Sequence, residues 1–192
     1  MIIVDELKEG FNIMLHPKSA TQKERKIGEA LAFYYKISII PLILYIILAL
    51  VVTSTSAAGL STLSAGLSGM LAIFGIITLL IIIPISLFVS AFLYQIFGRL
   101  FNVFSNPYSN TITAIVYGIV PTILFYWLSA VPLGSLVLII FAIWAFIVMI
   151  LALANQQKTS ALKAFAVIIV TSIIIGIIIG IIAFIIGLGA IL

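Results

Sequence analysis

The chain has 192 residues, of which 65% are hydrophobic and 7% are charged, and its formal net charge is +4. Ordinary globular domains carry roughly 25% charged residues, so this composition excludes a soluble fold and indicates that the apolar surface is buried in a bilayer. The chain has no cysteine, which excludes disulfides, thiolate metal sites and cysteine nucleophiles.

The charges are concentrated near the N-terminus. All five acidic residues and six of the nine basic residues lie within the first 36 positions. Beyond them the only charged residues are Arg99, Lys158 and Lys163. We therefore divide the chain into a cytoplasmic N-terminal segment, residues 1–36, and a membrane domain, residues 37–192. Nucleic acid is not an expected partner, because the basic residues do not form one clustered face.

Residues 2–15 carry apolar side chains at helical spacing with charged side chains opposite, which predicts an amphipathic helix. Such a helix either lies on the membrane surface or packs on the protein itself, and the sequence leaves both open. Thr21 and Glu24 fit a capping box, so a second helix is expected to begin there. His16 is the only histidine and, without a second ligand-type neighbour, is interpreted as a surface residue.

Apolar runs in the remainder predict an all-α fold, a polytopic membrane bundle of about five transmembrane helices preceded by amphipathic N-terminal helices. The predicted spans are residues 37–53, 70–97, 111–131, 135–154 and 164–192. The first span is not expected to be a cleaved signal peptide, because the charged region before it is too long. A short interfacial helix is expected before Asn106-Pro107. The short turn with Pro132 and Gly134 predicts that the third and fourth spans form a tight antiparallel hairpin.

Proline and polar residues within the spans form a first set of candidates. Pro84 lies at the centre of the second span and predicts a kink, which is either a hinge or a fixed packing geometry. Pro121 lies within the third span. Together with Gln95 and Tyr117, these prolines are the candidate kink or groove residues.

Two further sets of candidates concern contacts. In the last span, Gly176 and Gly180 form a small-xxx-small face, suited to a contact between subunits or to packing within the chain. Five residues beside the loops are candidates for contacts with a partner or with lipid headgroups: Phe97, Arg99, Phe101, Lys158 and Lys163. For the cations among them, the alternative is a role in membrane topology alone.

The basic residues also predict an orientation. In a five-span layout, all nine fall on one side of the membrane. The positive-inside rule then makes the N-terminus cytoplasmic and puts Leu192 outside. We expect a multi-pass protein in the cell membrane of a prokaryote, the source being suggested by the isoleucine-rich, cysteine-free composition.

The membrane domain lacks the residues that catalysis requires. No Asp, Glu or His follows Glu29. Acid–base catalysis, metal hydrolysis and proton coupling all need such residues, so the sequence predicts no catalytic, metal or cofactor site and no enzyme. It equally disfavours a proton-coupled transporter.

Several motifs carry a resemblance to a known family. They are YGIVP at 117–121, the turn with Pro132 and Gly134, a span with a central Trp144, and NQQKTSALKA at 155–164. On these motifs the region of about 90–171 resembles the Yip family, the Ypt/Rab-GTPase-interacting integral membrane proteins. The resemblance implies an adaptor or membrane-shaping role. The long N-terminal region with its D-L-Y-G-P motif is absent, so GTPase binding is not carried over.

Two functions follow as hypotheses. The first is a non-enzymatic membrane scaffold or adaptor, whose partners are membrane lipids and other membrane proteins or a second copy of the chain. The alternative is a passive lipid scramblase or small-solute channel. It requires polar side chains along one continuous groove, and the candidates are Ser86, Ser90, Gln95, Tyr117 and Thr122.

Overall fold

The structure is a computed structural model and describes residues 2–57, 70, 73–131 and 133–189. In chain order the elements are α1 (Ile2–Leu15), α2 (Pro17–Ala20), α3 (Ile27–Ala57), the π-helical turn η1 (Thr78–Ile82), α5 (Ile83–Leu100), α6 (Tyr108–Leu124), the 3-10 helix η2 (Tyr126–Ala130), α7 (Gly134–Gln156) and α8 (Ala161–Gly189). These described segments contain no strand. The predicted all-α, polytopic membrane bundle is confirmed.

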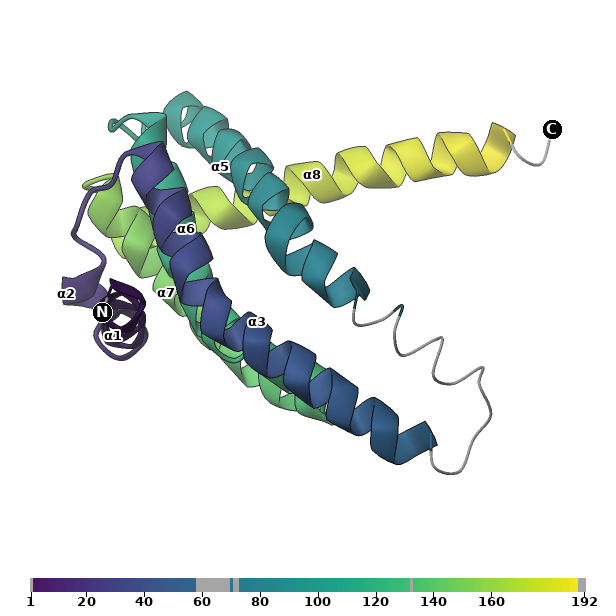
Figure 1. Cartoon of the computed structure of the whole chain (residues 1–192). Helices are drawn as coiled ribbons and strands as arrows, with labels where there is room; N and C mark the ends of the chain where they lie inside the picture. The colour runs from purple at the N-terminus through teal and green to yellow at the C-terminus, as the bar shows by residue number, and fades with distance from the viewer. Residues whose placement is uncertain (1, 58–69, 71–72, 132, 190–192) are drawn as a thin grey trace.

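Four of the described helical stretches are long and apolar enough to cross a membrane: Ile27–Val52, Ile73–Leu100, Gly134–Gln156 and Ala161–Ile178. A fifth apolar helix, α6, is shorter, at 17 residues. It is the central element, and α1, α3, α5 and α7 all contact it (Figure 1). Nearly every side chain of α6 is buried, including those of Ile112, Val116 and Val120.

Two helix boundaries differ from the sequence prediction. The predicted helix start at Thr21 is wrong, because the Thr21 hydroxyl donates to the carbonyl of Pro17 at 2.6 Å and caps nothing downstream. Instead α3 begins at Ile27, where the Lys26 N–H donates to the Glu29 carboxylate at 3.3 Å. From there α3 continues without a break through residue 36, at which the N-terminal segment was predicted to end.

The predicted interfacial helix before Asn106 is also wrong. Its first residues are the last turn of α5, which runs to Leu100 and ends in a compact turn. Asn102 adopts a left-handed backbone with φ 54°, and the N–H groups of Val103 and Phe104 both donate to the Gly98 carbonyl. The Phe104 ring lies where a Cβ on Gly98 would be, so this close approach requires glycine.

A kink was predicted at Pro84, and the structure has a π-helical turn, η1, directly before this residue. Since Ile83 donates to the carbonyl of Thr78 and Pro84 has no N–H, the carbonyl of Leu79 loses its partner within the helix. The Tyr34 hydroxyl of α3 donates to that carbonyl. The hydroxyl of Tyr35 donates to the next carbonyl, at Leu80, at 3.3 Å. Two side chains of a neighbouring helix therefore bond to the carbonyls of this π-helical turn.

The predicted hairpin is confirmed, because α6 and α7 pack along each other more extensively than any other pair of elements. Leu133 adopts a left-handed backbone with φ 63°. A Cβ on Gly134 would lie 1.8 Å from the carbonyl oxygen of Leu128, so only glycine allows the chain to turn this closely. Pro132, predicted in the same turn, lies outside the described residues.

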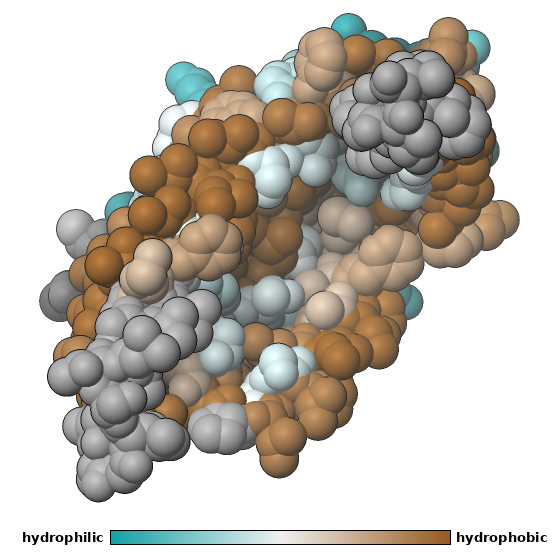
Figure 2. Space-filling model, turned by 90° about the vertical axis from the view of Figure 1, so that its right-hand side faces the viewer, coloured by the Kyte–Doolittle hydropathy of each residue, from teal (hydrophilic) through white to brown (hydrophobic). Residues whose placement is uncertain are grey.

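The last helix, α8, packs on α5 and α7 near its start, where Ala164, Val167 and Ile168 are buried. Beyond these turns it diverges from the other helices (Figure 1). Its exposed side chains there include Ile173 and Ile177. Figure 2 shows the side of the molecule toward which α8 extends. This face is largely hydrophobic, with paler, weakly polar residues in a hollow at its middle.

Candidate functional site

Many of the hydrogen-bonded polar side chains that the structure describes gather at one end of the bundle, which we call the polar cap. It consists of the segment 16–26, the turn 101–107 and the turn 155–160, together with the adjoining ends of α5 and α6 and the acidic face of α1. Side chains from these segments bond to one another across long stretches of sequence. Every ion pair in the described residues uses Glu6 or Glu9, on the acidic face of α1.

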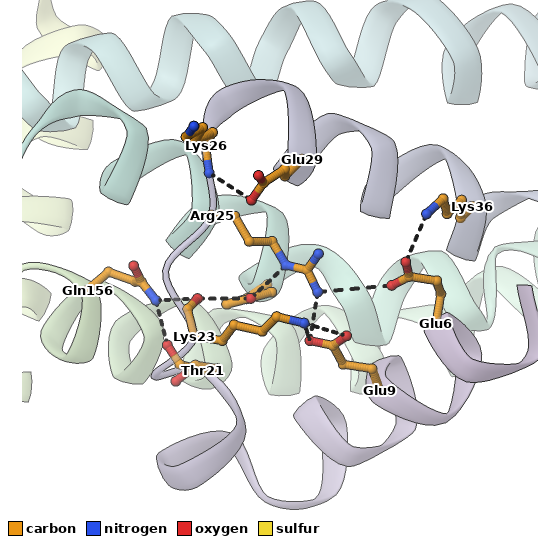
Figure 3. A network of polar contacts seen from close by, with 10 residues as sticks. Glu6, Glu9, Thr21, Lys23, Arg25, Lys26, Glu29, Lys36 and Gln156 are labelled. Atoms are coloured by element: carbon orange, nitrogen blue, oxygen red, sulfur yellow. Dashed lines mark hydrogen bonds and ion pairs between the residues drawn. The ribbon is translucent and has the colours of Figure 1, made fainter. Parts of the chain in front are cut away.

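Arg25 is the centre of the cap (Figure 3). Its side chain is 8% exposed. Its Nε donates to the Tyr117 hydroxyl at 2.9 Å, its Nη2 donates to Glu9 Oε1 at 2.7 Å, and its guanidinium lies 4.4 Å from the centre of the Phe33 ring. The Tyr117 hydroxyl in turn donates to the Lys23 carbonyl at 3.0 Å. The YGIVP motif of α6 therefore anchors the N-terminal segment.

The electrostatics of Arg25 favour its charged form. Burial acts to lower the pKa of Arg25, but the hydrogen bonds with Glu9 and Tyr117, together with the electrostatic attraction of both groups, outweigh it and raise the pKa above its ordinary value. Glu9 also pairs with Lys23 at 3.4 Å, and Glu6 pairs with Lys36 at 3.0 Å. These pairs tie the acidic face of α1 to the segment 16–26 and to α3.

Helix α1 therefore docks on the protein, one of the two positions that the sequence left open. Gly10 lies against Val120 and Ile37, and the Trp144 Nε1 of α7 donates to the Met14 carbonyl at 2.8 Å. The opposite face of α1 exposes apolar side chains: Val4, Phe11 and Leu15. The same helix thus contacts the protein on one side and presents an apolar surface on the other.

Two amides that follow the apolar part of α7 hold the N-terminal segment. Asn155 Nδ2 donates to the Lys18 carbonyl at 2.9 Å and to Thr21 Oγ1 at 2.7 Å. Gln156 Nε2 donates to the carbonyls of Thr21 and Lys23 at 2.8 and 2.9 Å (Figure 3). Gln156 is buried, so its bonds are shielded from water.

The third amide, Gln157, holds the opposite side of the cap. Its Nε2 donates to Thr111 Oγ1 at 2.8 Å, and its Oε1 accepts from the Asn106 backbone N–H at 3.0 Å. The Thr111 hydroxyl donates to Gln95 Oε1, and Gln95 Nε2 donates to the Asn106 carbonyl at 3.0 Å. Residues 155–157 thus join α5, α6 and both of the remaining cap segments.

The candidate groove residues do not come together. Gln95 and Tyr117 are both buried, but each belongs to its own network, with Thr111 and with Arg25. Pro84 and Pro121 are buried in the packing of α5 and α6. Ser86, another groove candidate, is exposed and bonds to its own helix. Gln95, Tyr117 and Ser86 therefore bond to three different partners.

The candidate contact residues lie around the side of the cap formed by α5 and α8. The rings of Phe97 and Phe101 stack with centroids 6.4 Å apart. Arg99 lines one shallow groove and Lys163 another, whereas Lys158 is exposed with a left-handed φ of 51°.

The glycine candidates lie on α8. Nothing lies within 4 Å of the position that a Cβ on Gly176 would take, so this residue contributes no packing to the rest of the described chain. The surroundings of Gly180 lie outside the described residues. No group of three His, Cys, Asp or Glu residues comes together among the described residues.

Sequence reasoning missed Arg25 and the role of the three amides 155–157. Arg25 looked like one more basic residue of the N-terminal segment. The sequence did contain a signal for the amides: three consecutive amide side chains at the end of an apolar span need hydrogen-bond partners if they are buried.

A family model described as the Yip1 domain matches residues 11–186. No curated protein and no solved structure matches the chain.

Proposed function

The chain belongs to the Yip1 domain family, and from this premise we propose that it is a non-enzymatic membrane scaffold or adaptor. Family and apolar helices together make it a multi-pass integral membrane protein. The observation that supports an adaptor is the polar cap. It presents exposed polar and basic side chains on a backbone that buried hydrogen bonds fix from within.

A fixed surface binds a partner at lower entropic cost than a mobile one, because little ordering remains to be done on binding. In the cap, the bonds of Tyr117 and Gln156 hold segments that are 94 and 133 residues away in sequence. The spans, in contrast, carry no acid or histidine beyond Glu29 that would serve proton coupling or hydrolysis. This distribution of polar groups favours recognition of a partner through the cap.

We assign the cap to the cytoplasmic side, with the N-terminus inside and Leu192 outside, because all nine basic residues belong to the cap or flank it in the chain. The absence of cysteine allows a direct test with single-cysteine variants. A membrane-impermeant maleimide applied to intact cells is expected to label Ser129→Cys, in η2 at the opposite end, and to spare Lys158→Cys until the cells are lysed. Labelling of Lys158→Cys in intact cells would reverse the orientation.

The adaptor function is tested by photocrosslinking in cells. A photoreactive amino acid replaces Lys158 on the cap, and the control replaces Leu133, an exposed residue of the hairpin turn at the opposite end. We expect a discrete protein adduct from position 158 only. Adding Gln156→Leu, which removes the bonds to the segment 16–26, should abolish the adduct while the protein remains in the membrane.

The alternative function gives a different set of results. If purified protein in liposomes equilibrates a fluorescent lipid between leaflets, and the cap adducts are missing, the chain is a scramblase and the adaptor proposal fails. A groove mechanism would lose that flux in Tyr117→Phe and Gln95→Leu with assembly unchanged. We expect these two variants to weaken assembly instead, because both side chains are bonded inside the cap.

A further inference from the structure

The basic residues of the protein fall into two groups. Every ion pair in the described residues uses a cation from the N-terminal 36 positions: Lys23, Arg25 and Lys36. Arg99, Lys158 and Lys163 lie on the α5 and α8 side, and no acidic residue follows Glu29 anywhere in the sequence. These three exposed cations therefore form no ion pair within the described chain, and their charge is available to an anion from outside.

One of these cations belongs to a groove. Lys163, Ala166, Val167 and Val170 line it from α8, at positions i, i+3, i+4 and i+7, so that the lysine stands at one end of a stripe of small apolar side chains. The groove has a volume of about 170 Å³ and is open to the surroundings of the protein. Lys163 is its only charged lining residue.

The opposite wall of the groove comes from Phe101 and Val103. This wall is fixed by the turn that ends α5, in which the Gly98 carbonyl accepts from the N–H groups of Val103 and Phe104 at 2.8 and 3.0 Å. Val167 is buried against the core, which fixes the α8 wall as well. The groove is therefore a preformed feature of the folded chain.

We propose that this groove binds an anionic phospholipid, with the phosphate paired to the Lys163 ammonium and a segment of one acyl chain lying along Ala166, Val167 and Val170. The position of the groove selects a lipid. Lys163 lies three residues into α8, and the candidate membrane span of that helix begins at Ala161, so the apolar stripe leads from the cation into the bilayer. A soluble anion would use the lysine but would leave the apolar stripe uncovered.

The test is native mass spectrometry of the full chain released from detergent micelles. Phosphatidylglycerol and phosphatidylcholine with identical acyl chains are added in turn, and retention of the first bound lipid is measured. We expect phosphatidylglycerol to be retained preferentially. Because a basic residue near a membrane surface contributes about 1 kcal/mol to anionic lipid binding, Lys163→Gln should lower the apparent affinity for phosphatidylglycerol about fivefold. The matched control is Lys158→Gln, which removes an unpaired lysine outside the groove and should leave the affinity unchanged.

A second pair of variants tests the apolar stripe. Ala166→Phe places a ring in the groove, whereas Ala161→Phe places the same ring on an exposed position of the same helix. We expect only Ala166→Phe to reduce retention, and to do so for both lipids. Equal retention of the two lipids by the unmodified protein, or equal effects of Lys163→Gln and Lys158→Gln, would overturn the proposal. Crosslinking from position 158 reports on the adaptor function separately, so each proposal can fail without the other.

Discussion

Helices α6 and α8 are both apolar, yet they occupy opposite environments. α6 carries Asn110, Thr111, Thr113 and Tyr117, and the protein buries it almost completely. α8 is nearly free of polar groups, and beyond its first turns it exposes its isoleucines. In water the more hydrophobic helix would lie inside. In a bilayer, lipid is as apolar as leucine, so the helix with hydrogen-bonding side chains gains most from protein neighbours.

The comparison also says where substitutions matter. Helix α6 contacts α1, α3, α5, α7 and η2, whereas the outer part of α8 has no described neighbour at positions such as Gly176. We therefore expect changes to α6 and its partners to lower the free energy of unfolding, and equivalent changes on α8 to have little effect. In each case the measurement is unfolding of the purified protein by SDS in mixed micelles, followed by circular dichroism.

The largest effect is expected from Arg25→Leu, which removes the partner of Tyr117 on α6 and leaves Glu9 without its closest cation. Losing one member of a largely buried ion pair costs about 3 kcal/mol or more. The control is Lys158→Gln, whose side chain pairs with no acid, and we expect no change. A loss below 1 kcal/mol for Arg25→Leu would mean that the cap does not stabilise the fold.

The next largest effect is expected from replacing a glycine of α6, compared with the same replacement on α8. A Cβ on Gly118 of α6 would lie 2.5 Å from Cβ and 2.8 Å from Cα of Met149 on α7, so Gly118→Ala forces the two helices apart. Overpacking of this kind costs about 1–3 kcal/mol. Gly176→Ala on α8 meets nothing within 4 Å and should be neutral, or stabilising by up to about 1 kcal/mol through helix propensity. The reverse order would contradict the contrast between the helices.

Two buried threonines provide an isosteric pair. Thr113 Oγ1 on α6 donates to the carbonyls of Arg25 and Ser109 at 3.1 and 2.9 Å, so Thr113→Val should cost about 1 kcal/mol. Thr171 Oγ1 on α8 is buried without a hydrogen-bond partner in the described chain, so Thr171→Val should be neutral or stabilising. A cost for Thr171→Val equal to that of Thr113→Val would indicate a partner for Thr171 outside the described residues.

The smallest effect compares two isoleucines. Ile112 on α6 is 1% exposed, and Ile112→Val should cost about 0.5–1.5 kcal/mol through the methyl group that it removes from the core. Ile177 on α8 is 57% exposed, and Ile177→Val should cost nothing measurable. A measurable cost for Ile177→Val that grows with protein concentration in the micelle would mean that a second copy covers α8.

The sequence predicts those features of this fold that depend on neighbouring residues. The apolar runs indicate the membrane helices, and the turn before Gly134 indicates the hairpin. Features that depend on contacts between residues far apart in the sequence could not be predicted. Arg25 and Tyr117 are 92 positions apart, and a charge near the N-terminus is equally consistent with a role in topology alone. The predicted capping box at Thr21 is wrong because the Thr21 hydroxyl donates to Pro17 of α2 and accepts from Asn155.

The same long-range bonds form only after the later of their two residues has been synthesised. Lys23 leaves the ribosome 133 residues before Gln156, which donates to the Lys23 carbonyl together with Tyr117. At about 5–20 residues per second, this interval lasts roughly 7 to 27 s. During this interval the segment 16–26 lacks its hydrogen bonds to Asn155 and Gln156. A nascent chain stalled before α7 therefore presents a polar cap without the bonds made by residues 155–157, and this distinguishes it from the finished protein.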